Sequence, residues 1–183
     1  MEYLRQHNVQ IRIARLFNTY GPRMLENDGR VVSNFIVQAL TGKPFTIYGD
    51  GSQTRSFCFV SDTIDALIRL MNQETTYGPV NIGNPGEYTI KQLAETVQSM
   101  VDPSVPITYK PIPSDDPRKR QPDITLAKQH LHWQPLVPLQ QGLELTIADF
   151  RARLTAAAAV DAENQAAQAA MKTDLTASAP ANV

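Results

Sequence analysis

Residues 9–23 have the sequence VQIRIARLFNTYGPR, and this stretch decides the fold class. Residues 9–16 have the apolar pattern of a buried β-strand, and Gly21-Pro22 predicts a turn after it. Residues 1–8, ahead of the strand, have the pattern of the end of a helix. A helix end followed by a strand is an unusual start for a domain. We therefore expect the strand to need neighbours beyond those in this chain.

Beyond the turn, predicted helices and strands alternate as far as residue 154. Helices are predicted at residues 31–40, 62–72, 90–101, 124–131 and 139–154, and strands at residues 45–48, 55–60, 79–82 and 107–109. Thr89 is expected to cap one of these helices, and Ser61-Asp62 another. The helix after Ser61-Asp62 is expected to have Ile64, Leu67, Ile68 and Met71 on one apolar face. The alternation predicts an α/β fold.

The composition is that of one soluble globular domain, with 42% hydrophobic residues, 19% charged residues and a formal net charge of -1. This balance gives no electrostatic basis for binding nucleic acid. No apolar run is long enough to span a bilayer and no signal-peptide pattern is present, so we expect a cytoplasmic protein without membrane partners. The single cysteine, Cys58, is expected to be a buried, unreactive thiol, and the three histidines lack the spacing of a metal site.

Polar residues follow two of the predicted strand and turn segments. Asn18 comes directly after the first strand, where ligands bind in open parallel sheets, and its amide could donate to a phosphate or a sugar oxygen. Arg55 follows the glycine turn of residues 49–52, and its planar guanidinium suits a phosphate. The alternatives are an Asx cap at Asn18 and a solvent-facing arginine in an ordinary hairpin.

Two further segments carry charge next to predicted helices. Residues 115–123 place two acids and three bases in one loop, from which an arginine could fold over a diphosphate. Residues 27–35 open a helix with free N–H groups that suit an anion or the edge of a base. Solvated loop charge and simple helix capping are the alternatives for these two segments.

Taken in this order and spacing, the segments resemble extended short-chain dehydrogenases/reductases that act on nucleotide sugars, over residues 1–154. Residues 21–24, 27–35, 51–55 and 115–123 are most similar to the subfamily that decarboxylates UDP-glucuronate. The resemblance implies that this α/β chain is the C-terminal, substrate-binding part of such a protein, with only the last strand or strands of its Rossmann sheet.

The same resemblance implies a division of the chain into three parts. Residues 1–24 would be the end of the Rossmann-type domain, and residues 25–154 a nucleotide-sugar-binding domain. Residues 155–183 are Ala-rich with few bulky apolar side chains, which predicts a frayed helix that runs into a disordered tail.

The resemblance also implies roles for individual residues. Asn18 would contact the UDP-sugar. Arg55 and Arg120 would hold its diphosphate, with Arg120 also near the sugar carboxylate, where it would assist catalysis. The uridine pocket would be lined by Asn34, Tyr48 and Gln53.

Four more residues receive roles from the resemblance. Thr19 and Arg30 would contact NAD. Tyr3 and Gln6 lie three apart on one helix face and would reach the substrate or the second subunit of the homodimer that the family forms.

The implied reaction is the NAD-dependent conversion of UDP-glucuronate to UDP-xylose. Bound NAD+ would oxidise the C4 hydroxyl, the β-keto acid would lose CO2, and the retained NADH would reduce C4 again. The sequence contains neither the Gly-rich phosphate turn nor the Tyr-x-x-x-Lys pair of the family. We therefore expect a fragment that is inactive alone and that needs a separate N-terminal half.

Two alternatives remain open at this point. One is a fragment of a nucleotide-sugar 4-epimerase or 4,6-dehydratase, although such proteins usually have Arg-Pro-Gly-Asp where this chain has residues 118–123. The other is a non-catalytic remnant or binding module.

Overall fold

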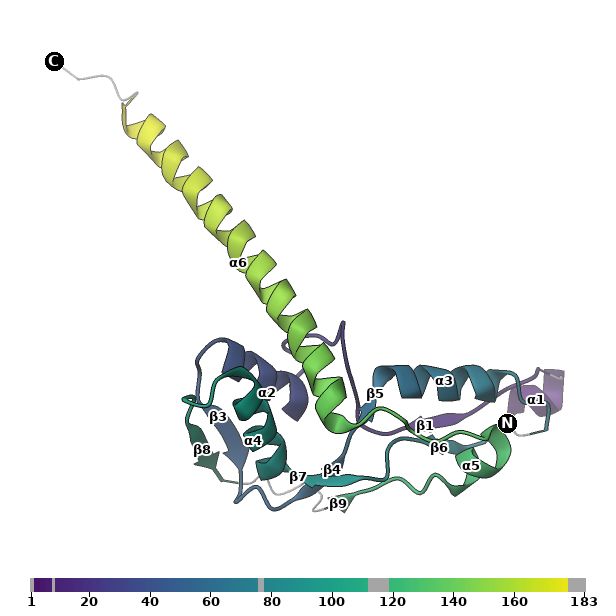
Figure 1. The fold of residues 1–183 in the computed structure, drawn as a ribbon. Helices are drawn as coiled ribbons and strands as arrows, with labels where there is room; N and C mark the ends of the chain where they lie inside the picture. Colours follow the sequence, from purple (N-terminus) through teal and green to yellow (C-terminus); the bar gives the residue numbers. More distant parts are fainter. Residues whose placement is uncertain (1, 8, 76–77, 112–118, 178–183) are drawn as a thin grey trace.

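The computed structural model describes residues 2–7, 9–75, 78–111 and 119–177, and its helices and strands alternate along the chain (Figure 1). The helices are α1 (Glu2–His7), α2 (Val31–Leu40), α3 (Val60–Met71), α4 (Ile90–Val101), α5 (Thr125–Leu131) and α6 (Leu139–Ala177). The strands are β1 (Ala14–Leu16), β2 (Thr19–Tyr20), β3 (Phe45–Tyr48), β4 (Thr54–Ser56), β5 (Cys58–Phe59), β6 (Val80–Ile82), β7 (Glu87–Thr89), β8 (Ile107–Lys110) and β9 (Lys119–Arg120). The predicted α/β class is confirmed.

One core forms around the parallel pair β1 and β6, with Ala14 opposite Val80 and Leu16 opposite Ile82. Helices α3 and α5 pack on this pair, and Val80 and Ile82 are fully buried between them. Asp62 of α3 fastens the segment ahead of α6, because its Oδ2 accepts the backbone N–H groups of Leu136 and Val137, each at 3.0 Å. These contacts connect the segment that leads into α6 to the helix that packs on the β1–β6 pair.

A second, larger core lies at the other end of the molecule (Figure 1). Helices α2 and α4 and the first turns of α6 pack together there, beside the parallel pair β3 and β8. Phe35 and Phe45 meet edge to face at its centre, with ring centroids 5.4 Å apart. Thr89 caps α4 as predicted, in a capping box with Gln92. The three-stranded sheet β7-β4-β9 lies between the two cores.

The two cores interleave along the sequence. β1 packs with α3, β6 and α5, and all three elements come after the second core has begun at α2. The physical reason is that parallel strands need a crossover between them, and α3 supplies it for β1 and β6. The chain therefore leaves the second core twice to return to β1, and the expected division at residue 24 stays a prediction.

Two predicted apolar surfaces are exposed. β1 has three residues rather than eight, and Leu16 is 52% exposed, so the prediction of a buried strand is wrong. α3 begins at Val60, with Phe59 as its N-cap, and buries Asp62, Thr63, Ala66 and Leu70. The predicted apolar face exposes Ile64, Ile68 and Met71, while Leu67 is partly buried. Among the described residues, no element covers that side of α3.

Helix α6 is longer than expected. It is anchored by Leu143, Ile147 and Phe150, and it then projects away from both cores (Figure 1). Residues 155–166 are exposed throughout, yet the helix continues to Ala177. The structure thus gives a helix as far as Ala177, where a frayed helix that runs into a disordered tail was expected over residues 155–183. Residues 178–183 lie outside the described part. Alanine has the highest helix propensity, and extending an anchored helix avoids the cost of nucleation.

None of the helices in the described ranges combines the length and apolar character needed to cross a membrane.

Candidate functional site

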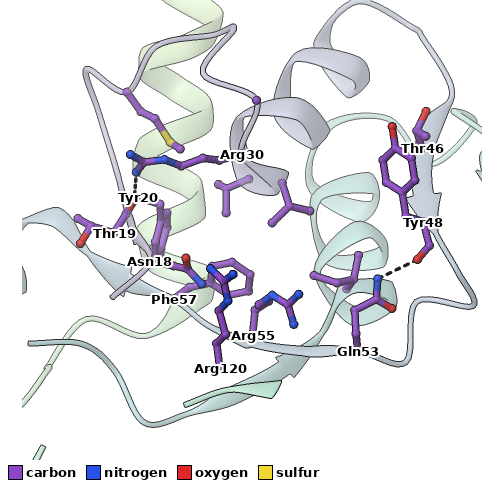
Figure 2. Close-up of a pocket in the computed structure, with 15 residues that line it drawn as sticks. Asn18, Thr19, Tyr20, Arg30, Thr46, Tyr48, Gln53, Arg55, Phe57 and Arg120 are labelled. Atoms are coloured by element: carbon purple, nitrogen blue, oxygen red, sulfur yellow. Dashed lines mark hydrogen bonds between the residues drawn. The ribbon is translucent and has the colours of Figure 1, made fainter. Parts of the chain in front are cut away.

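A cavity of about 350 Å3 opens where the two cores meet (Figure 2). Its walls come from β2, the loop before α2, and the strands β3, β4 and β9. It is lined by Asn18, Thr19, Tyr20, Met24, Gly29, Arg30, Val31, Val32, Thr46, Tyr48, Gln53, Arg55, Phe57, Ile90 and Arg120. Seven of the residues predicted from the sequence are thereby brought together: Asn18, Thr19, Arg30, Tyr48, Gln53, Arg55 and Arg120.

Two arginines lie side by side in this cavity. Arg55 on β4 is directly opposite Arg120 on β9 in a parallel register, so both side chains leave the sheet on the same face. Arg55 is 8% exposed and donates from Nη1 to Thr54 O at 2.8 Å, while Arg120 is exposed. Figure 2 shows both guanidinium groups directed into the cavity. Two adjacent positive charges repel each other, and an anion placed between them would offset that repulsion.

Asn18 and Thr19 lie where β1 ends. Asn18 donates from Nδ2 to Ser56 O at 3.3 Å, and its own carbonyl accepts from Cys58 N at 2.8 Å. The Thr19 hydroxyl lies 3.2 Å from the Thr63 hydroxyl on α3. These bonds fix the chain as it crosses from the first core to the cavity. The amide of Asn18 therefore lies at the carboxyl end of a parallel strand, where it was predicted to lie.

The opposite end of the cavity offers flat apolar walls with polar edges. Gln53 is buried, and its Nε2 donates to the carbonyl of Tyr48 at 2.8 Å. Val31, Val32 and Ile90 supply apolar surface beside them. Apolar walls with a few fixed donors and acceptors suit a planar heterocycle.

Tyr20 and Cys58 are not candidates for proton transfer. Burial is the main cause that raises the pKa of Tyr20, and its hydroxyl donates to Leu139 O at 3.2 Å. Burial likewise raises the pKa of Cys58 to about 11, so the thiol stays protonated at neutral pH. The prediction that Cys58 is buried is confirmed.

Two of the predicted residues that the structure describes, Asn34 and Gln6, do not line the cavity. Asn34 is outside the set of described residues that line it, because its Nδ2 donates to Gly29 O at 3.2 Å. Gln6 lies on α1 and donates to Glu2 Oε1 at 3.2 Å. The side chain of Tyr3 lies outside the described residues, as do residues 115–118 of the charged loop.

The sequence analysis missed Thr46 and Phe57, which also line the cavity. Thr46 and Tyr48 are two apart on β3, whose inner residues Phe45 and Ile47 are fully buried. The period of two in a strand places Thr46 on the same side as Tyr48, so this residue could have been found from the alternation. Phe57 carries no comparable signal, because it lies between two short strands.

A second cavity adjoins the first at the end of β1 and is lined by Arg15, Leu16, Phe17, Asn18, Thr19, Arg30 and Arg120. Thr19 and Arg30, which were expected to contact NAD, both line this second cavity. β1 leads into the extended strand β2, whereas a pyrophosphate site needs a glycine turn that enters a helix N-terminus. The residues present therefore do not fit the whole of an NAD molecule, and no reaction step follows from them alone.

Comparison with known proteins gives concordant results. Residues 1–83 match the NAD dependent epimerase/dehydratase family. UDP-glucuronic acid decarboxylase 4 of Arabidopsis thaliana is 58% identical over 154 residues, which are 84% of this chain and 34% of that protein. UDP-glucuronic acid decarboxylase 1 of Danio rerio is 51% identical over 152 residues, which are 83% of this chain and 36% of that protein.

Solved structures with the same fold include two 4-epimerases. UDP-glucose 4-epimerase of Thermotoga maritima, solved with UDP-glucose, superposes with a TM-score of 0.78 at 32% identity, over 84% of this chain and 50% of that one. UDP-glucuronic acid 4-epimerase of Bacillus cereus, in complex with UDP-glucuronic acid and NAD, superposes with a TM-score of 0.74 at 27% identity. This match covers 81% of this chain and 47% of that one. The chain thus spans about a third of the length of these curated relatives and about half of the solved chains.

Proposed function

Because this chain belongs to the NAD dependent epimerase/dehydratase family, we propose that it is the UDP-sugar-binding part of a UDP-glucuronate decarboxylase. The observation that carries the proposal is the register pair of Arg55 and Arg120, whose side chains enter one cavity from neighbouring strands. Two planar guanidinium groups in that arrangement match a diphosphate, and each can donate two parallel hydrogen bonds to phosphate oxygens.

The rest of the cavity supports one orientation of the ligand. The uracil ring lies at the apolar end, between the walls of Val31 and Ile90, with Gln53 and Tyr48 at its polar edge. The diphosphate lies between Arg55 and Arg120. The sugar then extends towards Asn18 and the second cavity, where Arg120 also reaches and can meet the carboxylate of glucuronate. Holding the sugar in one orientation is the contribution that such residues make to catalysis.

Oxidation at C4 requires a nicotinamide cofactor, and we propose that the glycine turn for its pyrophosphate is supplied by a complementary part of the protein. We propose that this complementary part packs on β1 and α3. Leu16, Ile64, Ile68 and Met71 are 50–74% exposed there. Among the described strands β1 pairs with β6 alone, and a two-stranded parallel sheet is normally covered on both faces.

Isothermal titration tests the binding half of the proposal. We expect the chain to bind UDP-glucuronate at one site, and Arg55→Lys and Arg120→Ala to weaken it. Arg151→Ala is the matched control, because Arg151 is an exposed arginine on α6 that does not line the cavity. A folded chain that binds no UDP-sugar, or equal losses in Arg151→Ala and the cavity variants, would overturn the assignment.

Complementation tests the reaction class. The chain is mixed with the cofactor-binding part of a UDP-glucuronic acid decarboxylase, and CO2 release from UDP-glucuronate is measured. The 4-epimerases among the solved structures supply the rival, since they share the fold. Epimerisation of UDP-glucose without CO2 release would identify the reaction as that of an epimerase rather than a decarboxylase. That result would not contradict the proposed UDP-sugar site.

A further inference from the structure

The loop between β2 and α2, residues 21–30, forms one wall of the cavity. Met24 and Gly29 of this loop are among the residues that line it. Met24 also packs against the second core, whereas Leu25 beside it is 69% exposed. A loop that buries little apolar surface has low local stability. Its place as a wall therefore depends on polar contacts with neighbouring elements.

Arg153 of α6 supplies such contacts to the loop. Its Nη2 donates to Met24 O at 2.8 Å, and its Nη1 pairs with Glu26 Oε1. Its Nε donates to Asp149 Oδ2 at 2.9 Å, and the guanidinium lies 4.7 Å from the ring centroid of Phe150. Phe150 is fully buried and fixes this part of α6 on the core. One oriented side chain thus joins the anchored helix to two residues of the loop.

Asp149 holds the loop at a third residue. Its Oδ2 accepts from Arg23 N at 3.0 Å. Arg23 has a φ of +67°, a left-handed conformation that is strained for a residue with a side chain and persists only where its surroundings hold it. Asp149 and Arg153 are four residues apart and lie on the same face of α6. That face therefore fixes the backbone of the loop from Arg23 to Glu26.

The three charged side chains of this network are partly shielded from water. Arg153, Glu26 and Asp149 are 33%, 27% and 24% exposed. Charge-assisted hydrogen bonds in such places are stronger than fully exposed ion pairs. None of the three is among the described residues that line either cavity. Their effect on a ligand therefore passes through the loop.

We propose that Arg153 and Asp149 are positioning residues, which hold the loop as a preformed wall of the UDP-sugar cavity. The inference rests on the proposed function, because it needs a UDP-sugar in the cavity. Ordering a loop during binding weakens affinity, and a loop that is fixed beforehand avoids this loss. The anchored part of α6 thus contributes to affinity although it does not touch the ligand.

A merely structural role for the network makes a different prediction. Contacts that only stabilise the fold would lower the melting temperature when they are removed. They would leave the affinity unchanged at a temperature where every variant is folded. Affinity and local order of the loop therefore distinguish positioning from stability.

The first readout is isothermal titration of the full chain with UDP-glucuronate, in the parent, Arg153→Ala, Glu26→Gln and the double variant. We expect Arg153→Ala to weaken binding roughly three- to tenfold, as for ordering one or two long side chains. Glu26→Gln should weaken it about twofold in the parent and not further in the Arg153→Ala background, because its charge acts through Arg153. Arg151→Ala, at an exposed arginine of the same helix, should bind as the parent does.

The second readout is hydrogen exchange of the free proteins, followed by mass spectrometry. In Arg153→Ala the amides of residues 23–30 should exchange faster than in the parent, because the loop has lost its contacts with α6. The amides of Val31–Leu40 should keep their parent rates, as should both segments in Arg151→Ala.

The results that would overturn the inference differ from those that would overturn the proposed function. A parent that binds UDP-glucuronate beside a folded Arg153→Ala of equal affinity, or of equal exchange over residues 23–30, would overturn the inference alone. If Arg153→Ala does not fold, Glu26→Gln, which keeps the size of its side chain, decides by the same two readouts. A folded parent that binds no UDP-glucuronate would overturn both proposals.

Discussion

Arg55 and Arg120 form the proposed diphosphate clamp, and the substitution Arg120→Ala tests whether this pair acts in ligand binding or in folding. A charge-assisted hydrogen bond contributes about 1.5–3 kcal/mol, which corresponds to a loss of roughly 10- to 150-fold in affinity. Because Arg120 is exposed, solvent screening places its loss near the lower limit, roughly tenfold. Arg55 is 8% exposed, so Arg55→Ala should cost more affinity than Arg120→Ala.

The same substitution should have the opposite effect on stability. Like charges directly opposite on neighbouring strands are destabilising by about 0.2–1 kcal/mol, and Arg120 faces Arg55 in register. In Arg120→Ala the melting temperature of the free protein should therefore stay the same or rise by at most roughly 3 °C. Arg55→Ala should instead lower it, because Arg55 is buried and hydrogen-bonded to Thr54 O.

The assay is titration with UDP beside thermal melting followed by circular dichroism. Unchanged affinity of Arg120→Ala for UDP would refute the proposal that Arg120 binds the diphosphate. A fall in melting temperature that accompanies the loss of affinity would assign Arg120 to the fold rather than to the ligand.

Three other substitutions and one pH series follow from the structure. Asp62→Ala should destabilise the chain by about 2–4 kcal/mol in urea unfolding, because it leaves Leu136 N and Val137 N without their acceptor. Gly142→Ala should also lower the urea midpoint, since an added Cβ would lie 2.1 Å from the Tyr20 hydroxyl and 2.8 Å from Phe59; an unchanged midpoint would contradict this packing. Ile68→Lys should leave the melting temperature within about 2 °C yet block complementation, because Ile68 is 54% exposed on the surface proposed for the partner; unimpaired complementation would place the partner elsewhere. Hydrogen bonds from Ser52, Ser104 and Thr125 hold the pKa values of Asp50, Asp102 and Asp123 below their ordinary value, so the stability that these carboxylates contribute is present at neutral pH and is lost as the pH falls below about 4. In the variant with all three aspartates replaced by Asn, the melting temperature should fall less steeply as the pH is lowered. An unchanged dependence of the melting temperature on pH would exclude these three groups as its cause.

Local patterns in the sequence predicted the elements that depend on neighbouring residues. The helix at Val31–Leu40 and the strand at Phe45–Tyr48 have the predicted bounds, because their periodicity and flanking turns are short-range signals. Asn18, Arg55 and Arg120 were found individually through the chemistry of their segments. Their convergence required the parallel pairing of β4 with β9, which lie more than 60 residues apart, and no local pattern contains that register.

The failures have a common physical origin. An apolar stripe such as Ile64, Ile68 and Met71 predicts a surface that prefers to be covered, but it does not say which residues cover it. β1 was predicted to be buried for the same reason, and it is exposed because β6 is its one partner among the described strands.

A crystal structure of the chain grown with UDP tests the central claim most directly. The account predicts the diphosphate between the guanidinium groups of Arg55 and Arg120, with the uracil ring beside Gln53 and Tyr48. UDP bound outside this cavity, or bound in it with its phosphates away from both arginines, would contradict the account.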